Sequence, residues 1–484
     1  MKHIAFLLFS VFSSIGMMGQ ITNYKYTFKI KGAKDTIYLA NYLAKQLYYN
    51  DTALADKNGT FVFTKPREIK PGKFAVVQPG KMDFELLINE AAFTFKGDTG
   101  NLIGGMTIEN SLENKLFYDY IKLINNKKRE IDPLNSKYRA SESDEEKERL
   151  LEKINALNKE VSDFQASIVK DHPTTLIAQV INMSIDVEIP EAPLNPDGSK
   201  DSTFSYYYYR DHYWDNTNLS NDALVRDPSF IKKLETYFDK IVVQHPDTLS
   251  LYADELVAQM DKEGEMFKIT VNWLINHYSK SKIMGLDAVY VHMAKNYYMT
   301  GLAYWADSST VAKLSERVIA LSPTLVGNKA PNLTLFDTSG NRLISLSSVK
   351  AKYTVLYFWD SGCGHCKKAT PKLKKIYDEL HKYDVEVYAV GGELETKDWK
   401  KYIKENKLPW INVSDTPERP NGFRTVYDIY AYPKVFLLDE NKKIIAKQIG
   451  VEQLGDILLD KLKLKDKIDF GFVKSEDDDE EEAH

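Results

Sequence analysis

The sequence predicts a multidomain protein with an N-terminal antiparallel β-domain, a central mostly α-helical region and a C-terminal α/β domain. The chain has 484 residues, which is too long for a single hydrophobic core. Its hydrophobic pattern first repeats every second residue, then changes to a helical period, and ends in buried strands that alternate with helices. The net charge of −5 argues against a phosphate-binding surface, so we expect no nucleic-acid partner.

Residues 1–20 have the pattern of a secretory signal peptide. Lys2 precedes an apolar run from Ile4 to about Gly19, and the run ends in small residues. It is short for a membrane span, which needs about 20 apolar residues; an uncleaved anchor is the alternative. No cysteine follows the run, which excludes a lipoprotein. We therefore expect a mature chain that is soluble in the periplasm or cell envelope, where disulfides persist.

Residues 21–108 are predicted to form the small β-domain. The segment YKYTFKI alternates apolar and polar residues, as a half-buried strand does, and DKNGTFVF places an Asn-Gly turn before a strand. The segments GKFAVVQPG and DFELLINEAAFTF continue the pattern. No catalytic constellation is present in this β-domain.

Residues 109–184 are predicted to form a helical hairpin or coiled-coil region. Apolar residues share one helical face from Leu112 onward. We expect Pro133 to break this first helix, because proline lacks the N–H that the helix ladder needs.

The second helix of this region is expected to begin at a capping box formed by Ser143 and Glu146. Six apolar residues at alternating spacings of four and three form a heptad seam in it: Leu150, Ile154, Leu157, Val161, Phe164 and Ile168. Packing of the seam on the preceding helix is the favoured interpretation. The alternative is an intermolecular coiled coil, so a homodimer through residues 143–170 stays open.

Residues 185–322 are predicted to form a helical domain behind a polar, Pro-containing linker. Asp227 and Pro228 are a good N-cap and first-turn pair for one of its helices. The stretch SYYYYRDHYWDN is either a platform for sugar rings or interior packing. Packing is favoured, because successive aromatic side chains point in different directions. The histidines have no paired metal-ligand spacing, so we expect no metal site.

Residues 323–466 are predicted to form the α/β domain, and residues 467–484 a solvated acidic tail. The apolar strand YTVLYFW leads into a helix. The strands VEVYAV, WINV, KVFLLD and KIIAKQIG follow, with helices at KDWKKYIKENK and RTVYDIY. Buried strands that alternate with helices indicate one central sheet.

The only two cysteines of the chain, Cys363 and Cys366, follow the strand YTVLYFW. A disulfide between them would close too short a loop to stabilise a fold, and they supply only half of a structural zinc site. Redox chemistry is the remaining interpretation. Cys363 begins a helix, where unpaired amide groups favour a thiolate, so we expect it to attack a substrate disulfide. Cys366, one turn on and further inside, would then resolve the mixed disulfide.

The residues beside the cysteines are predicted to support this chemistry. His365 is either an exposed spacer or a cation that stabilises the thiolate, and the tuning role is favoured. Gly362 and Gly364 leave the sulfur uncovered, as a macromolecular substrate requires.

This region resembles the thioredoxin fold and, within it, the TlpA/ResA-like exported thiol-disulfide oxidoreductases. The resemblance covers about residues 326–464. Trp359 matches the family tryptophan before the first cysteine, and Pro371 matches the proline of the active-site helix. Pro433, in YDIYAYPKVFLLDENKKI, matches the cis-proline that faces the cysteines. The resemblance implies that Tyr432 presents backbone groups to an extended substrate strand.

The sequence departs from these families at two acidic positions. The buried aspartate of thioredoxin is Tyr357 here, and the glutamate of ResA-like reductases is Ala369. The proton acceptor for Cys366 is therefore unassigned. Three acidic residues are candidates by proximity alone: Asp360, Glu393 and Glu395. The Gly-His pair between the cysteines is that of protein disulfide isomerases, which leaves the direction of electron flow open.

The expected function is that of an exported thiol-disulfide oxidoreductase that exchanges disulfides with protein substrates through a CGHC pair, without a cofactor. An electron donor or acceptor in the envelope is implied. Peroxidase activity is disfavoured, because Asp360 occupies the threonine position of the TxxC motif. The alternative of another class is an envelope binding or scaffold protein with a redox-inactive thioredoxin-like domain. The retained cysteines, tryptophan and proline argue against that alternative, since a scaffold needs none of them.

Overall fold

The computed structural model describes residues 21, 23–33, 35–65, 69–78, 81–393, 396–415 and 422–472. The predicted signal peptide, Glu395 and most of the acidic tail lie outside these ranges. The described residues fall into two compact units. One holds the residues up to Val242 together with Leu256–Ile269, and the other holds Val243–Glu255 and the residues from Thr270 onward. Within the described ranges, no helix is both long and apolar enough to cross a membrane.

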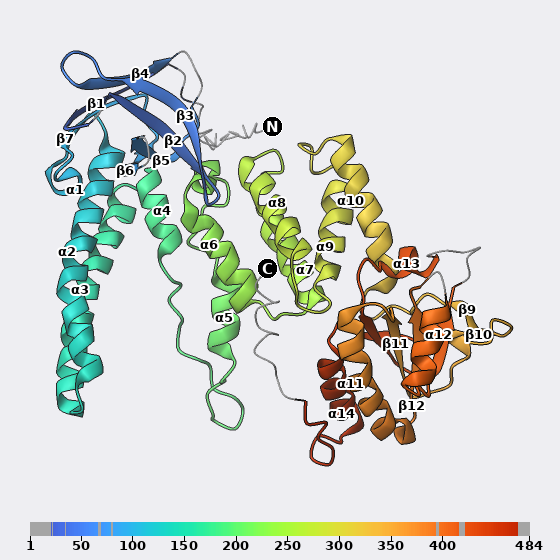
Figure 1. Ribbon diagram of the computed structural model, residues 1–484. Coiled ribbons are helices and arrows are strands. Elements are labelled where there is room, and N and C mark those ends of the chain that lie inside the picture. Colours follow the sequence, from blue (N-terminus) through green and yellow to red (C-terminus); the bar gives the residue numbers. More distant parts are fainter. Residues whose placement is uncertain are drawn as a thin grey trace, which may run out of the picture. The chain divides into compact units, whose positions relative to one another are not determined.

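The first unit begins with two four-stranded sheets, of strand order β4-β1-β7-β8 and β3-β2-β5-β6 (Figure 1). Phe28 and Phe95 of the first sheet contact Phe84 of the second, at ring-centroid distances of 6.0 and 5.9 Å, so an aromatic core lies between the sheets. The strands are β1 (Tyr24–Lys31), β2 (Thr36–Leu43), β3 (Gln46–Leu54), β4 (Thr60–Lys65), β5 (Gly72–Gln78), β6 (Lys81–Ile88), β7 (Ala92–Asp98) and β8 (Thr107–Glu109), with the short α1 (Leu102–Gly105) before the last.

The expectation of a wholly antiparallel β-domain is wrong at one pair. Strands β1 and β7 run parallel, with Phe28 opposite Phe95. Side chains alternate between the two faces of a strand in parallel and antiparallel sheets alike. The alternation in the sequence therefore predicted the strands but not the direction of this pair.

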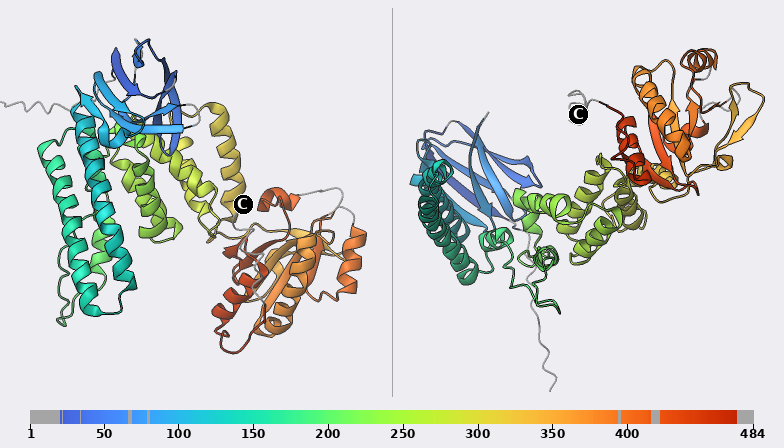
Figure 2. Two further views of the ribbon diagram at one scale, coloured as in Figure 1. Left: turned by 60° about the vertical axis from the view of Figure 1, so that its left-hand side comes forward. Right: turned by 90° about the horizontal axis from the view of Figure 1, so that it is seen from below.

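Helices α2 (Leu112–Ala140) and α3 (Asp144–Asp171) form the predicted hairpin, and they lie side by side in every view (Figures 1 and 2). Helix α2 continues through Pro133, so the predicted break is wrong. A proline inside a helix costs about 3 kcal/mol. Packing of α2 along α3 offsets this cost, and an ion pair between Lys127 of α2 and Glu160 of α3, at 2.6 Å, is part of that packing.

The heptad seam of α3 packs within the chain, as favoured. Leu150, Ile154 and Ile168 are buried, and Gln165 of α3 donates a hydrogen bond to the Tyr120 hydroxyl of α2 at 2.7 Å. The homodimer through residues 143–170 stays a prediction.

Only half of the expected capping box at the start of α3 is present. The Ser143 hydroxyl accepts a hydrogen bond from the Glu146 N–H at 3.3 Å, but the Ser143 N–H donates to the Ser141 hydroxyl and not to the Glu146 side chain.

A carboxylate distant in sequence caps the next helix, α4 (Leu176–Ser184). The Glu113 oxygens accept hydrogen bonds from the N–H groups of Leu176 (2.7 Å) and Ile177 (3.0 Å). Burial raises the pKa of Glu113, and these two N–H groups act against that rise by favouring the charged form. The bonds therefore tie α2 to the first turn of α4.

The aromatic stretch of α5 (Phe204–His212) is more exposed than expected. Tyr206 and Tyr207 are 39% and 48% exposed, so the prediction of interior packing is wrong for them. Tyr213 and Trp214, which follow the helix, are buried, and there the prediction is correct. The helices that follow before the α/β part are η1 (Asp222–Arg226), α6 (Pro228–Thr236), η2 (Tyr237–Ile241), α7 (Pro246–Ala258), α8 (Glu265–Ser279), α9 (Asp287–Met293), η3 (Ala294–Tyr298), α10 (Ser308–Leu321) and η4 (Ser322–Thr324). Asp227 caps α6 through the Ser229 N–H at 2.8 Å, with Pro228 in the first turn, as predicted.

The second unit contains a seven-stranded sheet of order β10-β9-β13-β12-β11-β14-β15. Its interior strand β11 (Tyr353–Trp359) pairs parallel with β12 and antiparallel with β14. All but the first residue of β11 are buried, which explains its unbroken apolar sequence. The other strands are β9 (Thr334–Asp337), β10 (Leu343–Ser345), β12 (Val385–Gly391), β13 (Ile411–Ser414), β14 (Lys434–Leu438) and β15 (Ile444–Lys447).

Helices cover both faces of this sheet. The helices α11 (Gly364–Leu380), α12 (Thr396–Glu405) and α14 (Val451–Leu462) share one buried cluster with the sheet. Helix α13 (Gly422–Tyr427) packs on the other face, where Tyr427 meets Phe358 and Phe436. The strand and helix order predicted for the C-terminal region is thus confirmed, and the end of β11 meets the start of α11 at one edge of the sheet.

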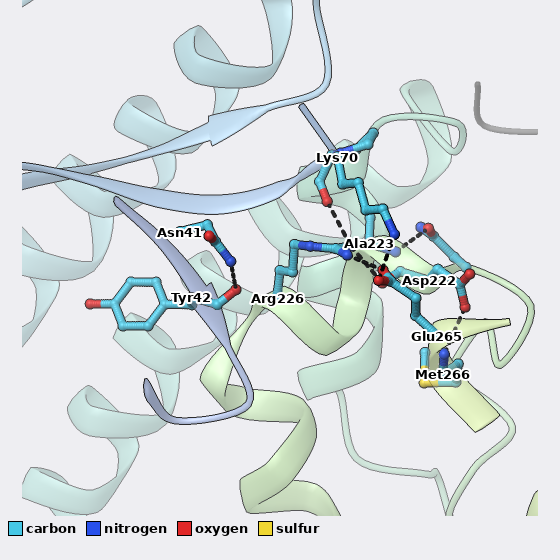
Figure 3. A network of polar contacts seen from close by, with 10 residues as sticks. Asn41, Tyr42, Lys70, Asp222, Ala223, Arg226, Glu265 and Met266 are labelled. Carbon is cyan, nitrogen blue, oxygen red and sulfur yellow. Dashed lines mark hydrogen bonds and ion pairs between the residues drawn. The ribbon is translucent and has the colours of Figure 1, made fainter. Parts of the chain in front are cut away.

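A buried ion pair links the β-sheets of the first unit to its helices (Figure 3). The Arg226 side chain, 6% exposed, pairs with the Glu265 carboxylate and also donates to the Pro71 carbonyl at 3.3 Å. Lys70 approaches the same carboxylate at 2.7 Å. Asp222 accepts the N–H of Met266 at 2.7 Å. The network therefore joins the loop before β5, η1 and the first turn of α8.

We predict that Arg226→Met lowers the free energy of unfolding by about 2 kcal/mol, because the Pro71 carbonyl and part of the Glu265 charge lose their buried partner. Urea denaturation measures the change. The control is Lys45→Met, which removes the exposed ion pair with Glu235 (2.5 Å). It should cost less than about 1 kcal/mol. Equal losses in the two variants would contradict the role given to Arg226.

Candidate active site

The two cysteines lie where β11 ends and α11 begins. Cys363 is the N-cap residue of α11, with φ −72° and ψ 127°, and its side chain makes no capping hydrogen bond. Both thiols are free. Cys363 is half-buried, whereas Cys366, one helical turn further, is 1% exposed. The structure thus places one sulfur at the surface of the helix start and the other in the core.

Each sulfur has a backbone partner. The Cys363 thiol lies 3.5 Å from the Tyr432 carbonyl oxygen, to which it donates. The Asp360 N–H donates to Cys366 Sγ at 3.4 Å. Burial raises the pKa of Cys366 to about 12, and the Asp360 N–H acts in the opposite direction. Cys366 is therefore a protonated thiol at neutral pH, which leaves Cys363 as the thiol able to begin an exchange.

The loop before β14 faces the Cys363 thiol. The Tyr432–Pro433 peptide bond is cis, as expected from the sequence. The Tyr432 ring is half-buried, and the Arg424 guanidinium lies 5.2 Å from its centre. Burial raises the pKa of the Tyr432 hydroxyl to about 12. An ion pair between Arg317 of α10 and the buried Asp428, at 2.6 Å, holds the segment between α13 and this loop.

The other predicted supporting residues have different environments. Trp359 is fully buried, and its ring stacks on Tyr357 at 6.2 Å, so it supports the site from inside the core. Pro371 lies inside α11 without ending the helix. A Cβ at Gly364 would meet no atom within 4 Å, so the surface beside the sulfurs is open. His365 is exposed, and its tuning role stays a prediction.

A hydroxyl pair occupies the place where thioredoxin has a buried aspartate. The Tyr357 hydroxyl lies 3.0 Å from Thr370 Oγ1, and both residues are buried. Burial raises the pKa of Tyr357, and the neighbouring cysteines raise it further. Thr370 was not among the predicted site residues, although its spacing of four from Cys366 places both on one helical face. Ala369, at the ResA-like glutamate position, offers no polar group.

Of the three candidate proton acceptors, two lie in the described residues. The Asp360 carboxylate accepts the N–H of Gly362 at 2.7 Å. The Glu393 carboxylate accepts the N–H of Ser361, and burial raises the pKa of this carboxyl group. A pocket of about 460 Å³ opens beside them. It is lined by Asp360, Ser361, Gly362, Lys367, Glu393, Asp398, Lys401, Tyr402 and Glu405. Among the described residues, no group of histidine, cysteine and acidic side chains could hold a metal ion.

Known proteins match the α/β part of the chain. The AhpC/TSA family matches residues 326–447. Thiol-disulfide oxidoreductase ResA of Bacillus subtilis is 31% identical over 124 residues, which are 26% of this chain and 67% of ResA. Sporulation thiol-disulfide oxidoreductase A of the same organism is 33% identical over 133 residues, which are 26% of this chain and 78% of that protein.

A solved structure, described as a domain of a "possible thiol-disulfide isomerase" from Cytophaga hutchinsonii, is 45% identical. It covers 30% of this chain and 99% of its own, with a TM-score of 0.28. Further towards the N-terminus, a domain of unknown function (DUF5106) matches residues 141–316. The AhpC/TSA match, at residues 326–447, covers the part of the chain that holds the two cysteines.

We predict that iodoacetamide at pH 7 modifies Cys363 of the reduced protein and leaves Cys366 unmodified. The raised pKa of Cys366 keeps it protonated below about pH 12, so its thiolate fraction should rise about tenfold for each pH unit above 7. Peptide mass spectrometry after timed alkylation measures both sites. In urea the two thiols should react at similar rates. Equal labelling in the folded protein at pH 7 would contradict the assignment of the buried thiol.

Proposed function

The chain belongs to the ResA-like thiol-disulfide oxidoreductases, and we propose that it exchanges disulfides with protein substrates through Cys363 and Cys366. The proposal rests on the unequal burial of the two thiols: Cys363 is half-buried, and Cys366 is 1% exposed. A substrate disulfide can reach only the first thiol directly, whereas the second can act once Cys363 is bonded to the substrate.

The exchange proceeds in two displacements. In the reducing direction, the Cys363 thiolate attacks one sulfur of the substrate disulfide, and the other substrate sulfur leaves as a thiolate that takes up a proton. Cys366 then loses its proton and attacks Cys363 Sγ, which breaks the mixed disulfide and releases the second substrate thiol. Two electrons pass to the substrate, and the Cys363–Cys366 disulfide remains. Oxidation of a substrate uses the same two displacements in reverse. Isomerisation uses the first displacement, after which a different substrate thiolate attacks the mixed disulfide and releases Cys363, so no net electrons are transferred.

The backbone beside Cys363 suits an extended protein substrate. The Tyr432 carbonyl already lies 3.5 Å from Cys363 Sγ, so peptide groups of this loop are close to the reacting sulfur. Hydrogen bonds from such groups hold a substrate strand without reading its side chains. The open surface at Gly364 leaves room for the substrate main chain.

We place the mature protein in the cell envelope, on the basis of the signal-like residues 1–20. A cycle that turns over needs a second redox partner there, because each reduction of a substrate leaves the Cys363–Cys366 pair oxidised. We also propose that the chain divides at residues 108, 184 and 322 into a β part, a helical hairpin, a helical part and an α/β part.

We predict that Cys363→Ser abolishes disulfide exchange, whereas Cys366→Ser accumulates mixed disulfides. In the second variant Cys363 still attacks, but no thiol is left to release the substrate. Non-reducing electrophoresis of each variant with a disulfide-bonded protein, followed by mass spectrometry, identifies the trapped species. The double variant is the control. Trapping by Cys363→Ser instead would reverse the roles, and no exchange by the wild-type protein would support the scaffold alternative.

A further inference from the structure

The end of β12 holds the segment that precedes the active-site helix. The Gly392 N–H donates to the Trp359 carbonyl at 2.8 Å, which continues the pairing of β11 with β12. The next residue, Glu393, accepts the N–H of Ser361 through its carboxylate. Two successive residues therefore restrain the backbone of residues 359–361 from the side.

The restrained segment carries the N–H group that donates a hydrogen bond to the buried thiol. The Asp360 N–H, which lies between the two restrained positions, donates to Cys366 Sγ at 3.4 Å. This N–H favours the thiolate of Cys366 against the effect of burial. A hydrogen bond to a charged sulfur is stronger than one to a neutral thiol, so the orientation of this N–H matters most when Cys366 loses its proton.

The Glu393 carboxyl group is held in an unfavourable place. Its second oxygen, Oε2, is buried and has no hydrogen-bond partner among the described residues. A buried unpaired carboxylate oxygen is destabilising, so its presence at the active-site segment calls for a functional reason. The two positions where the related families have an acid are Tyr357 and Ala369 here, and Asp360 uses its own carboxylate on Gly362.

We propose that Glu393 is a positioning residue for the second displacement of the exchange. Its hydrogen bond to the Ser361 N–H fixes the turn after β11, so that the Asp360 N–H points at Cys366 Sγ while that sulfur attacks Cys363. In this step the Cys366 proton passes to water, a bond forms between the two cysteine sulfurs, and the substrate sulfur leaves with the electron pair of the broken bond. The inference rests on the proposed function.

Two substitutions separate the hydrogen bond from the charge. Glu393→Gln keeps the length of the side chain and an acceptor oxygen, but it removes the charge. Glu393→Asp keeps the charge, but it is one methylene too short to reach the Ser361 N–H. The matched control is the same pair of substitutions at Glu405, which lines the same pocket.

The first readout is the rate at which a preformed mixed disulfide on Cys363 releases its substrate thiol, followed by stopped flow. Glu393→Asp should slow this release about tenfold, as expected for the loss of a well-aimed hydrogen bond to a charged group. Glu393→Gln should restore at least half of the wild-type rate. Both Glu405 variants should release at the wild-type rate. Slow release by Glu393→Gln with wild-type release by Glu393→Asp would show that the charge matters instead, and it would overturn the inference. Wild-type release by both Glu393 variants would also overturn it.

The second readout needs no substrate. The rate at which iodoacetamide alkylates Cys366 above pH 7, followed by peptide mass spectrometry in a Cys363→Ser background, reports the thiolate fraction of Cys366 alone. Glu393→Asp should lower this alkylation rate about tenfold at a given pH, as a rise of about one unit in the pKa of Cys366 would, and Glu393→Gln should leave it near the wild-type value. An unchanged alkylation rate in Glu393→Asp would overturn the positioning role. If the wild-type protein exchanges no disulfides, the proposed function fails, and this alkylation rate still decides the role of Glu393.

Discussion

The structure depends most on the position of Cys363 at the first turn of α11, because that turn fixes the environments of both thiols. A helix advances one turn in 3.6 residues, so a sulfur three positions after the N-cap points back along the same face and into the core. Cys366 is accordingly 1% exposed, with a pKa raised to about 12, while Cys363 stays at the surface. One geometric constraint thus separates the thiol that begins an exchange from the thiol that completes it.

The surrounding elements maintain this difference in burial between the two thiols. Strand β11 is buried on both faces, and the cysteines follow its end at the edge of the sheet. The end of β12 restrains the turn after β11 through Gly392 and Glu393. The loop with the cis Tyr432–Pro433 bond brings a carbonyl oxygen to the outer sulfur. Segments next to three neighbouring strands, β11, β12 and β14, therefore surround a site whose chemistry resides in two sulfur atoms.

The sequence was informative where a local pattern has one physical meaning. The CxxC after an apolar strand predicted the half-exposed and the buried thiol, and Asp227-Pro228 predicted the start of α6. It failed where tertiary contacts decide. Pro133 does not end α2, because packing on α3 offsets the lost hydrogen bond. Strands β1 and β7 run parallel, and the alternation of apolar and polar residues is the same for parallel and antiparallel strands, so it could not predict their direction. The hydrogen bonds of Glu113 to Leu176 and of Glu393 to Ser361 join residues far apart in the chain, and no spacing rule connects them.

The reduction potential of the Cys363–Cys366 pair, measured by equilibration with glutathione, tests the central claim most directly. A redox-active pair at a helix start should have a potential between about −270 and −120 mV, the range of known dithiol oxidoreductases. A value in this range would support the account and would also indicate the preferred direction of electron flow. A value below about −300 mV, typical of structural disulfides, would contradict it, as would a pair that forms no disulfide at equilibrium.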